Sequence, residues 1–352
     1  MPKLALTFYS LLDIPIDDVV ECYQAAETSG FEYGFMSESA GRDAMVILAR
    51  AALATSSLKL GTNILPVFVR APWQTAASAL TLNEIADGRF HILGLGTSYK
   101  QRIETWFGES FEKPVLRTKE YVDVIRLLLS EGETNYAGQV FQMKEYPDLT
   151  ALCTASRDIR IYLGVTGPMM RKLAGRVADG VILNSLSTPE FVRESIELIE
   201  SGAENAGRSL SDVEIGCSIV FSASEDRNEA REAAKRALMF YIIYPEFDPI
   251  VKTTSLLPEV QRLREAYWSG DKKGAHELVT EEILDAFVVF GTPEECRQKL
   301  ARYVDAGVQL LVIRSCVDKL NGKEAVLKNI SALRNFGQGI PPALSDSPER
   351  SK

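Results

Sequence analysis

The feature that most limits how this chain can fold is a regular alternation of short apolar, β-rich runs with longer amphipathic segments. Eight runs have the composition of strands, at 4–9, 31–36, 58–65, 90–96, 159–165, 181–184, 213–221 and 310–314. Segments with helical spacing lie between them, at 17–28, 43–55, 72–87, 117–130, 168–178, 189–206, 228–241 and 293–305. Because a strand that is joined to the next strand through a helix pairs with it in parallel, this pattern predicts a parallel sheet.

The number of strands favours a closed sheet. Eight parallel strands, each followed by a helix, match a (β/α)8 TIM barrel, and an open doubly wound sheet is the alternative. Two segments interrupt the alternation: a hairpin is expected at 136–141 and a helical insertion at 245–285. The insertion, which contains Tyr267 and Trp268, is expected to roof the pocket. We therefore expect a single barrel domain over 1–336, followed by a flexible tail at 337–352 that contains three prolines.

Charge and hydropathy restrict the partners and the location. The chain has 352 residues with 39 Lys and Arg against 48 Asp and Glu, a formal net charge of −9. This acidic balance argues against nucleic acid or an anionic membrane as a partner, since both attract a dense basic surface. No apolar run reaches the roughly 18 residues of a membrane span, and the run at 4–9 has no signal-peptide cleavage site. We expect a cytoplasmic protein that acts on a small molecule.

The cysteines and histidines do not indicate a disulfide framework or a metal site. The cysteines are Cys22, Cys153, Cys217, Cys296 and Cys316. Their number is odd and none lies in a Cys-x-x-Cys pair, so we expect reduced thiols that serve as small buried residues rather than as a nucleophile. The only histidines are His91 and His276, which argues against a zinc site built from histidines.

In a TIM barrel, functional residues gather at the carboxyl ends of the strands. Those ends are 37–40, 63–66, 97–99, 165–168, 184–185 and Arg314. Glu38 follows the second strand, and a carboxylate at a barrel mouth can act as a general acid or base. The alternative is an ion pair with Arg42 that shapes the loop.

Two glycine-containing segments at strand ends are candidates for ligand contact. The segment 94–99 begins like a dinucleotide fingerprint, but Tyr99 stands where the third glycine belongs, so we reject a Rossmann site. Its glycines would either let a flat ring approach the backbone or permit tight packing. At 164–170 a glycine turn leads into a helix opened by Pro168, and the free N–H groups of Met169 and Met170 could hold a phosphate. An ordinary strand-to-helix turn is the alternative.

Several motifs in one order resemble the luciferase-like superfamily of flavin- and F420-dependent oxidoreductases, and most of all its methylenetetrahydromethanopterin reductase branch. The motifs are Leu60-Gly-Thr-Asn-Ile-Leu-Pro66, Arg70-Ala-Pro72, Leu82-Asn-Glu-Ile-Ala-Asp-Gly-Arg-Phe90, Leu93-Gly-Leu-Gly-Thr97, Arg117-Thr-Lys-Glu-Tyr121, Ile161-Tyr-Leu-Gly-Val-Thr-Gly-Pro-Met-Met170, Leu173-Ala-Gly175 and Ala178-Asp-Gly180. The similarity extends from about residue 3 to residue 335.

The resemblance implies a TIM barrel with insertions, a homodimer, and hydride transfer to or from coenzyme F420, with FMN as the alternative cofactor. It places a cis peptide bond at Asn63–Ile64, behind the flavin ring. The resemblance also implies that Gly96 and Thr97 contact the cofactor. The residues that it implies for the cofactor phosphate are Val165, Thr166, Gly167 and Pro168. An FMN-dependent monooxygenase and a non-catalytic flavin-binding protein are the competing interpretations.

The chain departs from the family pattern where a proton would be handled. Many F420-dependent members carry Asp-His after the second strand, where this chain has Glu38 and Ser39, and some carry a carboxylate where Ser98 and Tyr99 stand here. Glu38, Ser39 and Tyr99 are therefore our catalytic candidates. The acidic tail of F420 would need cations near the mouth, and Arg42, Arg70 and Arg171 are candidates for that contact.

Overall fold

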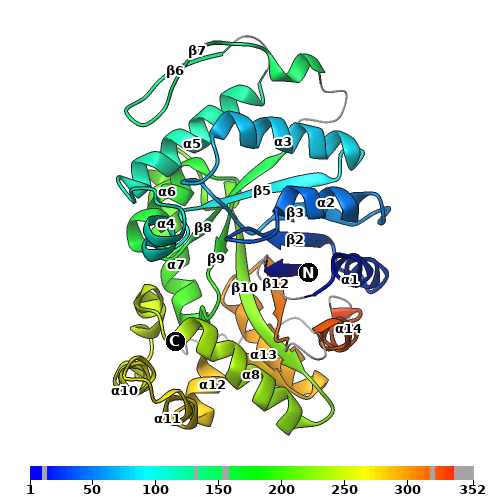
Figure 1. Cartoon of the computed structure of the whole chain (residues 1–352), viewed down its shortest axis with the longest axis vertical. Helices are drawn as coiled ribbons and strands as arrows, with labels where there is room; N and C mark the ends of the chain where they lie inside the picture. Colours follow the sequence, from blue (N-terminus) through cyan, green and yellow to red (C-terminus); the bar gives the residue numbers. More distant parts are fainter. Residues whose placement is uncertain (10–13, 131–133, 153–157, 318–321, 337–352) are drawn as a thin grey trace, which may run out of the picture.

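The computed structural model describes residues 1–9, 14–130, 134–152, 158–317 and 322–336, and in it eight parallel strands close into a barrel (Figure 1). In order around the ring they are β1 (Lys3–Tyr9), β2 (Tyr33–Ser37), β3 (Lys59–Thr62), β5 (Phe90–Gly96), β8 (Arg160–Val165), β9 (Gly180–Leu183), β10 (Glu214–Ala223) and β12 (Leu310–Ser315). β12 pairs with β1 and β9 pairs with β10, which closes the ring. The predicted (β/α)8 barrel is confirmed, and the open sheet is excluded.

Helices surround the barrel as the alternation predicted. They are α1 (Ile16–Thr28), α2 (Ala44–Ala52), α3 (Pro72–Ile85), α5 (Pro114–Leu128), α6 (Pro168–Val177), α7 (Pro189–Glu204), α8 (Arg227–Ile242) and α13 (Pro293–Asp305). Local chemistry sets several of their starts: the Asp43 carboxylate accepts from the N–H groups of Met45 and Val46 at α2, and proline opens α3, α5, α6, α7 and α13.

Several elements differ from the sequence prediction. The run 58–65 is interrupted: β3 ends at Thr62, and β4 (Leu65–Pro66) pairs with β5 beyond the cis Asn63–Ile64 bond. Three elements were missed, namely α4 (Lys100–Trp106), β11 (Val289–Gly291), which pairs with β10 outside the ring, and α14 (Gly322–Ala332). α4 and β11 are short, and the βα alternation gave no signal for them. α14 is the helix that a (β/α)8 barrel places after its last strand, but the sequence prediction stopped at that strand.

Both predicted interruptions are present. The hairpin consists of the antiparallel strands β6 (Thr134–Ala137) and β7 (Gln142–Tyr146), and it lies at one end of the molecule beyond α5 (Figure 1). The insertion is helical, with η3 (Pro245–Phe247), α9 (Asp248–Val251), α10 (Leu257–Trp268), α11 (Lys272–Glu277) and α12 (Glu281–Phe287). Two further 3₁₀ turns are η1 (Leu149–Leu152) and η2 (Leu210–Asp212).

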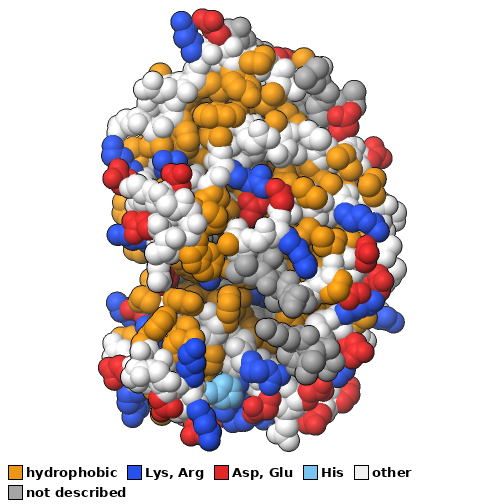
Figure 2. Space-filling view, in the orientation of Figure 1, with side chains coloured by type: hydrophobic (Ala, Val, Ile, Leu, Met, Phe, Trp, Pro, Cys, Tyr) orange, Lys and Arg blue, Asp and Glu red, His pale blue; other side chains and the backbone are white. Residues whose placement is uncertain are grey.

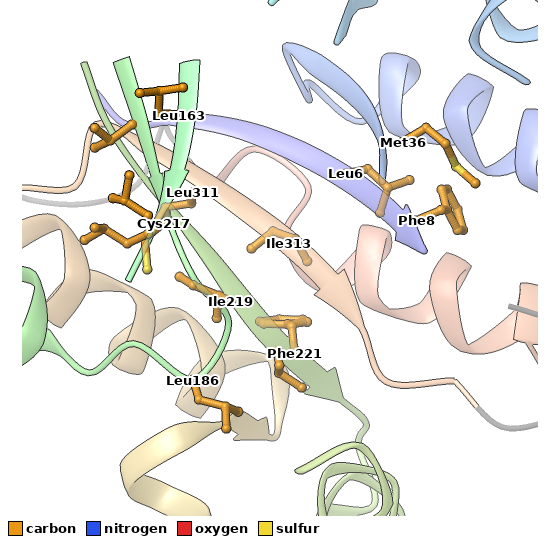
Figure 3. Packing of buried hydrophobic residues seen from close by; sticks show 14 of the residues in the cluster. Leu6, Phe8, Met36, Leu163, Leu186, Cys217, Ile219, Phe221, Leu311 and Ile313 are labelled. Carbon is orange, nitrogen blue, oxygen red and sulfur yellow. The ribbon is translucent and has the colours of Figure 1, made fainter. Parts of the chain in front are cut away.

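The core has two layers, because successive residues of a strand point to opposite faces of the sheet. One cluster, which fills the barrel interior, consists of Ala5, Tyr33, Phe35, Ile92, Tyr162, Ile182, Leu310 and Val312. The intervening residues pack against the helices, and Figure 3 shows Leu6 of β1 and its register partner Ile313 of β12 in this outer layer. Since Leu310 and Val312 point inward, Arg314 on the same strand does so too.

Charged and polar side chains close the amino-terminal end of the barrel. Glu214 accepts hydrogen bonds from Arg160 Nη1 at 2.7 Å and from the Tyr162 hydroxyl at 2.6 Å, and Lys3 lies 3.1 Å from its other oxygen. Burial opposes ionisation of Glu214, but these donors outweigh it and lower its pKa. Among the described residues, this cluster occupies the amino-terminal end of the barrel, and the cavity described below opens at the carboxyl ends of the strands.

The cysteines of the described residues are buried free thiols, as predicted. Cys22, Cys217, Cys296 and Cys316 are free and buried, and burial above all raises the pKa of each to about 12. Cys153 and the predicted tail at 337–352 lie outside the described residues. Over the described part of the chain, no helix combines the length and the apolar character that a membrane crossing requires.

Candidate active site

A cavity of about 430 Å³ opens at the carboxyl ends of the barrel strands. Figure 2 shows the surface hollowed at its left edge, between the region of α4 and that of α10. Strand ends and the loops that follow them contribute Tyr9, Ser37, Glu38, Ser39, Asn63, Ile64, Gly96, Thr97, Ser98, Tyr99, Gly164, Val165, Thr166, Gly167, Asn184, Ser185, Ser218 and Arg314 to its wall. The catalytic candidates Glu38, Ser39 and Tyr99 are in this wall, and so are the cofactor contacts implied by the resemblance except Pro168, which begins α6 beside it. Met169 and the three arginines suggested for the F420 tail are not in the wall.

Ile64 forms one wall of the cavity and lies over two glycines. The Asn63–Ile64 peptide bond is cis, as the resemblance implied, and the Ile64 carbonyl accepts a hydrogen bond from the Glu38 N–H at 3.0 Å. A Cβ at Gly96 would lie 3.0 Å from Ile64 Cγ1, and one at Gly164 would lie 2.9 Å from Ile64 Cγ2. The glycines therefore make room for Ile64, which supports the packing alternative for Gly96 and leaves Ile64 as the surface that a ligand meets.

Glu38 is held by an arginine other than the one that the sequence suggested. Arg70 donates from Nε to Oε1 at 2.6 Å and from Nη2 to Oε2 at 2.7 Å, and the Ala44 N–H donates to Oε2 at 3.1 Å. Arg42 instead donates to the carbonyl of Ile14. Glu38 therefore forms an ion pair, as the alternative interpretation expected, but its partner is Arg70 and not Arg42.

Tyr99 lies at the start of α4 against a cation. The guanidinium of Arg102 lies 4.6 Å from the centre of the Tyr99 ring, and Phe247 packs at 6.0 Å on it. Burial above all raises the pKa of Tyr99 above its usual range, so the phenol stays protonated at neutral pH and can donate a hydrogen bond into the cavity. The neighbouring wall residue Ser39 offers a second hydroxyl.

The predicted phosphate turn has the expected geometry. Gly167 is the N-cap of α6, Pro168 occupies its first turn, and the helix leaves the N–H groups of Met169 and Met170 without acceptors in its own backbone. Among the described residues, and apart from its two chain neighbours, no heavy atom lies within 4 Å of the position that a Cβ would take on Gly167. An anion could therefore approach this helix terminus from the cavity.

The cations of the cavity are not those proposed from the sequence. Arg70 binds Glu38, Arg42 binds Ile14, and the buried Arg171 pairs with Glu194 at 3.1 Å. The cationic residues that line the cavity are Lys100, Arg102 and Arg314. The alternation along β12 would have indicated Arg314, because it continues the inward positions Leu310 and Val312.

The insertion contributes to the site only through its first residues. Pro245, Glu246 and Pro249 line the cavity. Trp268 is 60% exposed and its indole N–H donates to the Ile243 carbonyl. Neither Trp268 nor Tyr267 is in the wall, so the insertion borders the cavity without these two aromatics. The histidines lie elsewhere too: His91 is in β5 beside Tyr33, and His276 is in α11.

The fold and the position of the cavity define a TIM-barrel protein. In this class the functional residues lie at the carboxyl ends of the strands and in the loops that follow them. Residues 6–310 match the family of luciferase-like monooxygenases, and the chain belongs to this family.

The chain is similar to two 5,10-methylenetetrahydromethanopterin reductases. The one from Methanopyrus kandleri is 31% identical over 312 residues, which cover 84% of this chain and 88% of that protein. The one from Archaeoglobus fulgidus is 31% identical over 316 residues, covering 86% and 93%. Among solved structures, the coenzyme F420 dependent tetrahydromethanopterin reductase from Methanopyrus kandleri matches with a TM-score of 0.82 at 26% identity and covers 96% of this chain and 99% of that one.

Proposed function

We propose that this protein is an oxidoreductase that transfers a hydride between coenzyme F420 and a small organic substrate. The observation that carries the proposal is the cavity wall itself, because Ile64 and the start of α6, with its free N–H groups, line the same cavity. Relatives that are about 31% identical over most of the chain are named 5,10-methylenetetrahydromethanopterin reductases, and the similar solved structure is described as a coenzyme F420 dependent reductase.

The described residues fit a deazaflavin with a phosphate-bearing side chain. The cavity volume of about 430 Å³ lies within the usual range for small-molecule sites. Asn63 Nδ2 is buried in this wall without a hydrogen-bond partner, so a ring carbonyl there would satisfy it. The turn at Thr166, Gly167 and Pro168 offers open space and helix N–H groups to a phosphate.

The bound deazaflavin would supply hydride transfer at C5, and the protein would supply position, shielding and polarity. Ile64 would support one face of the ring and leave the other face to the substrate. Tyr99, which stays protonated, and Ser39 would donate hydrogen bonds at the reacting end. Glu38 would act through Arg70, by fixing the loops that follow β2 and β4.

Titration of the purified protein with F420 and, separately, with FMN tests the proposal. We expect quenching of F420 fluorescence with a micromolar dissociation constant and at least about tenfold weaker binding of FMN. Oxygen uptake with reduced FMN would instead support the monooxygenase alternative. Binding without turnover of any substrate would support a flavin-binding protein, and failure to bind either cofactor would contradict all three.

The remaining parts of the proposal concern location and assembly. We propose a cytoplasmic homodimer that does not bind nucleic acid or a membrane, on the basis of the acidic net charge of −9 and the family resemblance. Light scattering of the purified protein at several concentrations tests the dimer, since a single mass near 38.9 kDa would contradict it.

A further inference from the structure

Three cationic side chains line the cavity, and two of them have no carboxylate partner among the described residues. Lys100, Arg102 and Arg314 line it, although the net charge of the protein is −9. Among the described residues, Arg102 and Arg314 form no ion pair with a carboxylate. Each donates a hydrogen bond to a hydroxyl group instead. A cation that is not neutralised by the protein is available to a ligand.

Both arginines contact the same tyrosine. Arg102 Nη1 donates to the Tyr9 hydroxyl, and the guanidinium of Arg314 lies 5.5 Å from the centre of the Tyr9 ring. Arg102 is further confined by the rings of Tyr99 at 4.6 Å and Trp106 at 5.1 Å. We call Tyr9, Arg102 and Arg314 the arginine wall. Its side chains are positioned before any ligand binds, which lowers the entropy that binding costs.

The guanidinium of Arg314 is incompletely satisfied. Nη2 donates to the Ser37 hydroxyl at 3.0 Å, but Nε and Nη1 are buried and have no hydrogen-bond partner. Buried donors without acceptors are unfavourable, and more so when they carry charge. An oxyanion offers paired acceptors that match the planar donors of a guanidinium. Arg314 therefore offers the donors of an anion-binding site, and the ligand would supply the acceptors.

We propose that the arginine wall binds an anionic group of the substrate, a carboxylate or a phosphate. The inference rests on the proposed function, because it assigns the cofactor phosphate to a different part of the cavity from Tyr9 and Arg314, which end the neighbouring strands β1 and β12. The cofactor phosphate is expected at α6, which follows β8, whereas Arg314 ends β12, with β9 and β10 between these strands in the ring. The arginine wall is thus left to the second reactant.

Anion binding to the F420-saturated protein tests this inference. The protein is first titrated with F420, and the complex is then titrated calorimetrically with inorganic phosphate and, separately, with malonate. We expect one of these anions to bind, and Arg314→Met and Arg102→Met each to weaken it at least about tenfold. Arg262→Met, which removes an exposed arginine of α10, is the matched control and leaves binding unchanged.

The outcomes separate this inference from the proposed function. Tighter binding of phosphate indicates a phosphate ester as the substrate, and tighter binding of malonate indicates a carboxylate; both support the inference. Glu246→Gln, which removes a negative charge from the same cavity, should strengthen binding. If F420 binds but neither anion does, or if both arginine variants retain the affinity, the inference is wrong and the proposed function stands. If F420 itself does not bind, the proposed function is wrong. F420 affinity within about twofold of wild type shows that each variant is folded.

Discussion

Arg70 donates two parallel hydrogen bonds to Glu38, from Nε to Oε1 at 2.6 Å and from Nη2 to Oε2 at 2.7 Å. The Glu38 side chain is 9% exposed and that of Arg70 is 17% exposed, and the pair raises the pKa of the guanidinium above its usual range. A largely buried bidentate pair of this kind fixes two loops relative to each other. Glu38 therefore lines the cavity as a residue that holds the surrounding loops in place.

Glu38→Gln should therefore lower stability as well as activity. Arg70 keeps Asp43 as a partner at 2.7 Å, so we expect a loss of about 2 kcal/mol rather than the full cost of an unpaired buried charge. Chemical denaturation measures it, with Glu190→Gln on the exposed part of α7 as the control. The double variant Glu38→Gln/Arg70→Met should lose less free energy of unfolding than the sum of the losses in the two single variants. A kcat that collapses in Glu38→Gln at unchanged stability would instead establish Glu38 as a proton-transfer group.

Gly164→Ala should weaken cofactor binding through Ile64. The new methyl group would lie 2.9 Å from Ile64 Cγ2 and must displace that side chain toward the cavity. We expect the dissociation constant of F420 to rise about tenfold, in line with the cost of overpacking a rigid site. The measurement is fluorescence titration of the single variants and of the double variant with Ile64→Ala. Because the displaced atom is absent from the double variant, it should bind F420 better than the product of the single effects; strict additivity would show that the two residues do not interact.

The sequence predicted the barrel well because its signal is local. Strand and helix composition repeats along the chain, and the order of strands in a barrel follows the order in sequence. The run at 58–65 was mispredicted as continuous because its composition gives no sign of the cis bond at Asn63–Ile64. The site was predicted in outline for the same reason, since strand ends locate its wall.

The local sequence pattern could not predict ion pairs between residues that are far apart in the chain. Arg42 is four residues from Glu38 and was the obvious partner, but Arg70, 32 residues away, binds it. Arg102 was not considered because α4 was not predicted, and Arg314 was noted only as a strand end. Which cation meets which carboxylate depends on loops whose course is set by the folded barrel.

Glu120 attaches the β6–β7 hairpin to α5. Its buried carboxylate accepts from the N–H groups of Gln139 at 2.8 Å, Val140 at 2.8 Å and Phe141 at 3.0 Å. Burial opposes its ionisation, but these three donors outweigh burial and lower its pKa. Glu120→Gln replaces one acceptor oxygen by an NH2 group, so the hairpin should open more often.

Limited proteolysis measures this opening. We expect cleavage within 134–146 to become about tenfold faster in Glu120→Gln, while F420 binding is unchanged because no residue of the hairpin lines the cavity. Glu197→Gln on the surface of α7 is the control. Equal cleavage rates in the two variants would show that Glu120 does not hold the hairpin.

Glu27 should make the stability of the protein depend on pH in the acid range. Its Oε1 accepts from the N–H groups of Ser56 at 2.8 Å, Ser57 at 2.5 Å and Leu58 at 2.8 Å. Burial opposes ionisation, but these donors together lower its pKa to about 2, from an ordinary value of 4.5. A carboxylate whose pKa is lower in the folded state stabilises the fold above its unfolded pKa, and that contribution is lost as pH falls toward the folded value.

Glu27→Gln should therefore cost about 1–2 kcal/mol at neutral pH, a figure reduced for the partial exposure of the side chain. The difference from wild type should persist down to about pH 4.5 and shrink between about pH 4.5 and pH 2, because the wild-type carboxylate becomes protonated there. Urea denaturation of both proteins across this range measures it, and Glu200→Gln on α7 shows the behaviour of an exposed carboxylate. A difference that stays constant from pH 7 to pH 2 would mean that the charge of Glu27 does not stabilise the loop before β3.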